Sequence, residues 1–79
     1  MRPIYQIAID IRSDWPKPYF GAVTYISAMQ SINTIDCQYE ADSARSIVRY
    51  FLANASAWRG DKARAIKAEL KGMLQARQA

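Results

Sequence analysis

Histidine is absent from this 79-residue chain, and cysteine occurs once, as Cys37. Catalysis by a serine or cysteine nucleophile that needs a histidine base is therefore excluded, as is a metal site built from histidine and cysteine ligands. A single cysteine also excludes an internal disulfide, which favours a reducing compartment. The seven acidic residues are scattered instead of forming a carboxylate pair. We expect a protein that is not an enzyme and has no metal or other cofactor.

Long apolar runs are missing as well. Gln6 and Asp10 interrupt the apolar residues near the amino terminus, so no signal peptide is expected. No stretch reaches the 18 or so apolar residues that read as a membrane span, so we expect no membrane partner. The length fits a single domain, residues 1–79. Because so short a chain buries only about 60% of its unfolded surface, either a monomer or a homodimer is expected.

What the chain does have is ordinary globular composition and an excess of positive charge. Apolar residues make up 51% of it, and the formal net charge is +4 at pH 7. A basic surface of this kind favours an anionic partner, either nucleic acid or the acidic surface of another protein.

The amino-terminal half shows the alternation that is typical of half-buried strands. Residues 4–12 and 32–41 alternate apolar and polar side chains with a period of two. Residues 19–28 are ambiguous, because they are rich in β-formers and also fit a helical stripe, with Pro18 as a first-turn proline. We interpret this segment as a third strand that turns back near residues 29–31.

From Asp42 the apolar period changes to 3.6, which predicts two amphipathic helices. Asp42 or Ser43 caps the first helix, and Asn54 ends it. The second follows Gly60, with Asp61 as its N-cap. The buried stripes are expected to be Ala44, Ile47, Val48, Phe51 and Leu52 in the first helix, and Ala63, Ile66, Leu70, Met73 and Leu74 in the second.

The order of elements is then three strands followed by two helices. Strands that precede helices indicate an α+β fold. We predict a three-stranded antiparallel meander (β-β-β) with both helices packed on one of its faces.

The sequence "WRGDKARAIKAELK", residues 58–71, holds the most basic candidate site. Arg64, Lys67 and Lys71 are neighbours at helical spacings of three and four, and such a strip could follow phosphate groups. The alternative is a solvated helix face with no partner. Trp58 is expected to be a buried plug between helix and sheet, and Gly60 to supply a turn that a Cβ atom would forbid.

Two further places are candidates for contacts with a partner. Trp15 and Lys17 lie in a proline-stiffened loop and could form a protein-binding hot spot, or Trp15 could fold back over the sheet. Arg45 and Arg49 lie one turn apart, as a contact or as a solvated face. Cys37 is interpreted as a small buried apolar residue. The full set of candidate partner-binding residues is Trp15, Lys17, Arg45, Arg49, Arg59, Arg64, Lys67 and Lys71.

The segment "EADSARSIVRYFLANASAWRGDKARAIKAEL", residues 40–70, resembles the carboxyl-terminal half of small proteins encoded by phages and prophages of proteobacteria. In those proteins a strand enters an amphipathic helix that is followed by a Trp-Arg-Gly turn. Such accessory proteins include inhibitors of host defence such as anti-CRISPR proteins, which work by stoichiometric binding, often to a Cas effector complex. Many of these carry an acidic, DNA-like surface, whereas this chain is basic.

The resemblance implies a non-catalytic inhibitor that binds a host defence complex in the bacterial cytoplasm. Because the chain is basic, the contact is expected on an acidic protein surface or on guide RNA. The alternatives are a small basic protein that binds nucleic acid without sequence preference, and a virion or assembly component.

Overall fold

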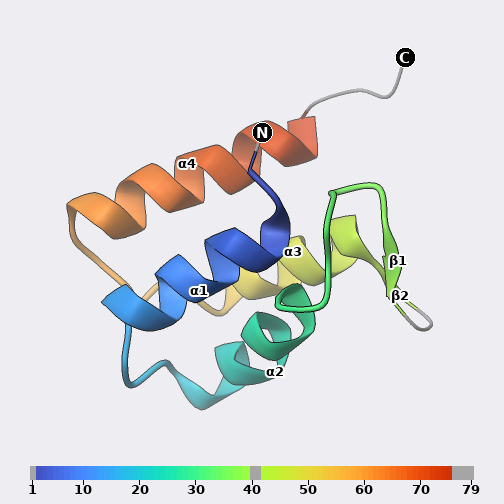
Figure 1. Cartoon of the computed structure of the whole chain (residues 1–79). Coiled ribbons are helices and arrows are strands. Elements are labelled where there is room, and N and C mark those ends of the chain that lie inside the picture. The colour runs from blue at the N-terminus through green and yellow to red at the C-terminus, as the bar shows by residue number, and fades with distance from the viewer. Residues whose placement is uncertain (1, 40–41, 76–79) are drawn as a thin grey trace.

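The computed structural model describes residues 2–39 and 42–75. These residues form four helices and one short strand pair (Figure 1). The predicted three-stranded meander is therefore wrong, and the described part of the chain is mostly helical. The elements in chain order are α1 (Ile4–Asp14), α2 (Phe20–Met29), β1 (Gln38–Tyr39), β2 (Asp42–Ser43), α3 (Ala44–Ala53) and α4 (Asp61–Gln75).

The first predicted strand, residues 4–12, is helix α1. The isoleucines of this segment fit both the period of two that is typical of a strand and the period of 3.6 that is typical of a helix, because Ile7 and Ile11 belong to both patterns. The structure uses the helical set, and the side chains that it buries completely are Ile4, Ile7, Ala8 and Ile11. Tyr5 and Ile9, which a strand would have turned inward, are exposed instead. Packing against neighbouring helices has decided between two patterns that the segment fits equally well.

The segment predicted as a strand over residues 32–41 is largely irregular. Only β1 is extended, and it pairs antiparallel with β2, with Gln38 opposite Ser43; residues 40–41 lie outside the described residues. The loop caps α1, because the backbone N–H of Ile4 donates to the carbonyl of Asn33 at 2.9 Å and that of Tyr5 to the carbonyl of Ile32 at 2.8 Å. Those donors have no partner within their own helix. The backbone carbonyls of Ile32 and Asn33 thus satisfy the first N–H groups of α1, as a capping side chain would otherwise do.

The ambiguous segment, residues 19–28, is helix α2, so its interpretation as a strand is wrong and its helical stripe is real. Ala22, Ile26 and Met29 are buried on that stripe. Pro18 is not in the first turn, because Tyr19 is the N-cap and the helix begins at Phe20.

The two carboxyl-terminal helices agree with the sequence prediction. Ser43 caps α3 by accepting a hydrogen bond from the backbone N–H of Ser46 at 3.2 Å, and Asn54 ends the helix. Asn54 keeps a negative φ of −106° and donates its side-chain amide to the carbonyl of Tyr50 at 2.8 Å, so it does not use the left-handed conformation. Asp61 is the first residue of α4 rather than its N-cap. Gly60 has a φ of +114°, as its place in the turn predicted.

Helices α2 and α4 each pack against both α1 and α3, so α2 and α4 lie on opposite sides of the molecule (Figure 1). One apolar core fills the space between the four helices. Besides the α1 residues, its largest fully buried side chains are Phe51, Ile26, Met29, Ile32, Leu70 and Val48. This arrangement leaves the outer faces of α2 and α4 available for contacts.

Candidate functional site

Trp58 closes the corner between α3 and α4, and it organises the site around it. Its side chain is only 2% exposed. The indole Nε1–H donates to Oδ2 of Asp14 at 2.8 Å, and the ring meets Phe51 edge-on with 6.2 Å between centroids. The ring of Trp15 stacks on it at 5.8 Å and 7°. Trp58 is thus buried as predicted, between helices rather than against a sheet.

Lys67, in the second turn of α4, is held against this corner. Its Nζ donates to the backbone carbonyl of Trp58 at 2.7 Å and lies 5.9 Å from the centroid of the indole ring. The pKa of the Lys67 amine is lowered, first by burial and then by the positive charges of Lys71 and Arg59. The carbonyl and the ring fix the position of the ammonium group without neutralising it.

A shallow hollow of about 300 Å³ opens beside this ammonium group. It lies over the first two turns of α4, and its lining residues are Trp58, Arg59, Gly60, Ala63, Arg64 and Lys67. Three of the six are cations, whereas none is an acid. The amino-terminal end of α4, with its unsatisfied N–H groups and positive helix dipole, adds to the positive potential there.

Acidic residues do little to neutralise this face. Asp61 lies 3.6 Å from Arg64, but both side chains are almost fully exposed, and pairs of that kind contribute little. Glu69 is engaged on the inner side of α4, where it accepts a hydrogen bond from Arg2 at 2.8 Å. Arg2 also binds Asp10 of α1, and both carboxylates raise its pKa. The pairing fastens α4 to α1 and leaves the outer face of α4 basic.

The structure brings together four of the predicted candidates: Arg59, Arg64 and Lys67 line the hollow, and exposed Lys71 lies one turn beyond. Arg45 has a different environment. It donates to the carbonyl of Leu74 at 3.0 Å and pairs with Asp36 at 3.2 Å, so it ties the loop to the end of α4.

The remaining candidates, Trp15, Lys17 and Arg49, do not line the hollow. Lys17 is exposed on the loop between α1 and α2, and Arg49 is exposed on α3. Trp15 is partly buried against the core, with its ring on that of Trp58. It folds back onto the domain, and its ring stacks on Trp58 instead of covering the expected three-stranded sheet, which the described residues do not form.

Gly60 and Ala63 complete the lining of the hollow, although neither was among the predicted partner-binding residues. With Arg64 and Lys67 they follow the helical spacing i, i+3, i+4 and i+7, so a helical projection brings them together. Their small size leaves the space between the cations open. The sequence gives no sign that the backbone carbonyl of Trp58 accepts a hydrogen bond from Lys67, because every residue type has a backbone carbonyl.

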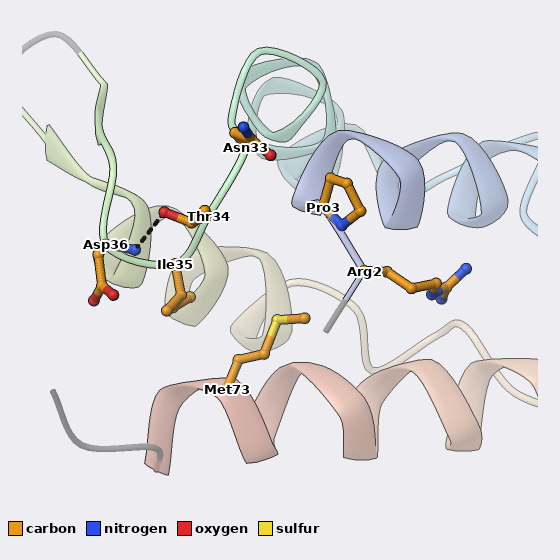
Figure 2. Close-up of a pocket in the computed structure, with 7 residues that line it drawn as sticks. All are labelled: Arg2, Pro3, Asn33, Thr34, Ile35, Asp36 and Met73. Carbon is orange, nitrogen blue, oxygen red and sulfur yellow. Dashed lines mark hydrogen bonds between the residues drawn. The ribbon is translucent and has the colours of Figure 1, made fainter. Parts of the chain in front are cut away.

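A second, smaller hollow of about 190 Å³ lies between the loop before β1 and the end of α4 (Figure 2). Its lining residues are Arg2, Pro3, Asn33, Thr34, Ile35, Asp36 and Met73. In Figure 2 the guanidinium of Arg2 points away from the other lining residues. Since Arg2 and Asp36 are engaged in ion pairs, this hollow offers few free polar groups.

Cys37 lies next to that hollow, in the loop, and is half-buried instead of facing inward from a strand. Its Sγ accepts a hydrogen bond from the backbone N–H of Thr34 at 3.4 Å and lies 3.5 Å from the Thr34 hydroxyl. These contacts lower the pKa of the thiol.

Within residues 2–39 and 42–75, no group of three or more His, Cys, Asp and Glu side chains is placed to hold a metal ion. No helix in the same part of the chain has the length and apolarity needed to cross a membrane. Comparison with protein-family models, with curated proteins and with solved structures finds no match to this chain.

Proposed function

We propose that this chain is a non-catalytic protein that binds the phosphate groups of nucleic acid through the basic hollow of α4. The observation that carries the proposal is the convergence of Arg59, Arg64 and Lys67 around one hollow without an acid in its lining. Like charges held together are costly, and an anion bound among them removes that cost. Phosphate groups fit this geometry, because arginine and lysine are the common donors to them.

The same geometry argues for binding without base recognition. Trp58 lines the hollow, but its ring is buried and already stacked on Trp15, so no aromatic face is offered to a base there. Stacking on exposed aromatic rings is what usually holds unpaired bases. The contact is therefore with the backbone, and the affinity depends on salt more than on sequence.

We further propose that the bound nucleic acid belongs to a host ribonucleoprotein. The resemblance of residues 40–70 to small phage and prophage proteins supports an inhibitor of host defence, and a guide RNA in an effector complex offers the phosphate groups. An acidic protein surface is the weaker candidate, because Trp15, its expected apolar anchor, is packed on Trp58. A small accessory protein that binds free nucleic acid would use the same hollow, so the target has to be separated by experiment.

The first experiment measures binding of a fluorescein-labelled RNA by anisotropy, in a salt series from about 50 mM upward. Arg64→Glu and Lys71→Glu change exposed cations on the proposed face, and Lys17→Glu makes the same change in charge on the loop between α1 and α2, at a residue that does not line the hollow. Each α4 variant is expected to weaken binding about tenfold and to lower the salt slope by about one contact, whereas Lys17→Glu stays near wild type. Lys67 is left unchanged because it supports Trp58. Equal losses in all three variants, or no binding at the lowest salt, would contradict the proposal.

The second experiment separates an inhibitor from an accessory protein. Tagged protein is used to capture complexes from bacterial lysate, with and without nuclease treatment, beside the Arg64→Glu and Lys17→Glu variants. An inhibitor retains one defined ribonucleoprotein at a fixed ratio, and Arg64→Glu releases it. Capture of bulk RNA and DNA that nuclease abolishes would instead support the accessory protein.

A further inference from the structure

Helix α2 presents an apolar outer face that the rest of the described chain does not cover. Phe20, Val23, Thr24 and Ser27 follow the spacing i, i+3, i+4 and i+7, and all four are exposed. Phe20 is 80% exposed, and among the residues that the structure describes its ring contacts only that of its neighbour Tyr19, with 4.8 Å between centroids. Phe20 is the most exposed large apolar side chain among the described residues, well above Ile9 at 51%.

A hollow of about 440 Å³ opens further along the same helix, between α2 and the start of α3. Its lining residues are Val23, Thr24, Tyr25, Ser27, Ala28, Asp42 and Ile47. The volume is ample for an aromatic ring, since a cavity of about 150 Å³ can hold benzene. One face of α2 therefore carries a projecting ring at one end and a hollow at the other.

We propose that this face binds a second copy of the chain, with two α2 helices antiparallel and Phe20 of each copy in the hollow of the other. In an interface with two-fold symmetry, the same surface of each copy faces that of the other. A projecting side chain can then be accommodated only if the same surface also carries a hollow. Thr24 lies midway between Phe20 and Ala28 along the helix, which places it at the two-fold axis. The antiparallel arrangement then fills both hollows at once.

Charge and area favour a second copy over a different partner. Residues 18–35 contain no charged residue, so α2 itself neither repels its own copy nor selects a charged partner, and Asp42 is the one charged residue among the described residues that line the hollow. The basic face of α4 lies on the opposite side of the molecule (Figure 1), which keeps the like charges of two copies apart.

The apolar surface extends from α2 onto α1. Arg12 donates to the hydroxyl of Ser27 at 3.0 Å and so joins the outer faces of α1 and α2. On α1, exposed Ile9 lies one turn before Arg12 and exposed Tyr5 two turns before it. A fully exposed aromatic side chain has a surface of about 200 Å². The exposed parts of the apolar side chains on α1 and α2 therefore amount to on the order of 500 Å² of accessible surface in each copy; these side chains are Tyr5, Ile9, Tyr19, Phe20 and Val23. Two copies would bury about 1,000 Å² in total, which is about the minimum for a biological interface and fits a weak dimer.

The proposal is tested first by sedimentation of the full chain over a range of concentrations. Wild type is expected to reach twice the mass of the 9.0 kDa chain. Phe20→Ser should raise the dissociation constant about a hundredfold, because symmetry removes two anchors with one substitution. Thr24→Glu should give a monomer by placing two carboxylates at the axis, whereas Ala65→Glu, the same insertion on the exposed face of α4, should leave the dimer intact. A wild-type monomer throughout, or a dimer that survives both α2 substitutions, would overturn the proposal.

Cross-linking tests the register without depending on the stability of the variants. In a Cys37→Ala background, Thr24→Cys should form a disulfide-linked dimer under a mild oxidant, because each Thr24 faces its own copy. Ala65→Cys is the matched control and should stay monomeric on a non-reducing gel. Equal cross-linking of the two variants would mean random collision and would refute the interface.

Discussion

Trp58 is the residue on which both the corner and the hollow depend, so we expect its replacement to have the largest effect on stability. Its buried ring contacts Trp15 and Phe51, and its N–H binds Asp14. Large-to-small changes at buried aromatic positions cost about 3–5 kcal/mol. A chain of this length has a free energy of unfolding of roughly 4–12 kcal/mol, so Trp58→Ala should leave it marginally folded.

Two milder variants divide this loss into its parts. Trp58→Phe keeps most of the buried ring and loses the hydrogen bond to Asp14, which is worth about 1 kcal/mol. Trp15→Ala removes a ring that is only partly buried, together with a stacking contact of about 0.5–1.5 kcal/mol. We expect the order of destabilisation to be Trp58→Ala, then Trp15→Ala and Trp58→Phe close together.

The assay is urea denaturation followed by circular dichroism at a helical wavelength, which does not rely on the tryptophans that are changed. The RNA-binding assay is run on the same samples under conditions where each variant is folded. Trp15→Ala should lose stability and keep its affinity for RNA. A Trp15→Ala variant with unchanged stability and weaker binding would refute this packing argument and restore Trp15 as a contact residue.

The remaining predictions concern two glycines and the single cysteine. Gly60→Ala should destabilise the protein by about 1–3 kcal/mol, because the backbone φ of +114° is favourable only for glycine. The loss would come from this backbone strain and not from a steric clash, since no atom lies within 4 Å of the added Cβ. Gly72→Ala, in helix α4 with open space around it, should instead stabilise by about 0.5–1 kcal/mol; equal effects in urea denaturation would contradict both assignments. Alkylation of Cys37 by iodoacetamide should reach its half-maximal rate at a lower pH in the folded protein than in urea, because Thr34 lowers the thiol pKa and so enlarges the thiolate fraction near neutral pH. Thr34→Val should move the midpoint upward, and an unchanged profile would exclude the hydroxyl contact.

The sequence predicts the carboxyl-terminal half of the fold well and the amino-terminal half badly, for a physical reason. In α3 and α4 the apolar residues fit only the 3.6 period, and a serine cap and a turn glycine mark the boundaries. In α1 the isoleucines fit both periods, and α2 is apolar on nearly all sides, so neither pattern is decisive. The choice depends on long-range packing, which a local pattern does not contain.

The candidate site follows the same division. The spacing of Arg64, Lys67 and Lys71 is a local property of α4, and the sequence indicates it directly. The packing of Trp15 onto Trp58 joins segments 43 residues apart in the chain, so the sequence could only leave it open. The sequence leaves Arg45 open between a partner contact and a solvated face, because its hydrogen bond to the carbonyl of Leu74 spans 29 residues and no local pattern shows it.

The distribution of charge over the four helices connects the two proposals. Arg2 forms ion pairs with Asp10 of α1 and Glu69 of α4, and these pairs join the two helices. Because Glu69 is paired there, its carboxylate does not neutralise the cations on the outer face of α4. Helix α2 carries no charge, so the basic face and the apolar face end up on opposite sides of the molecule. A dimer formed through α2 would therefore present two basic hollows outward. Two linked sites on one nucleic acid bind far more tightly than one, so Thr24→Glu should weaken binding to a long RNA and leave binding to a short one unchanged.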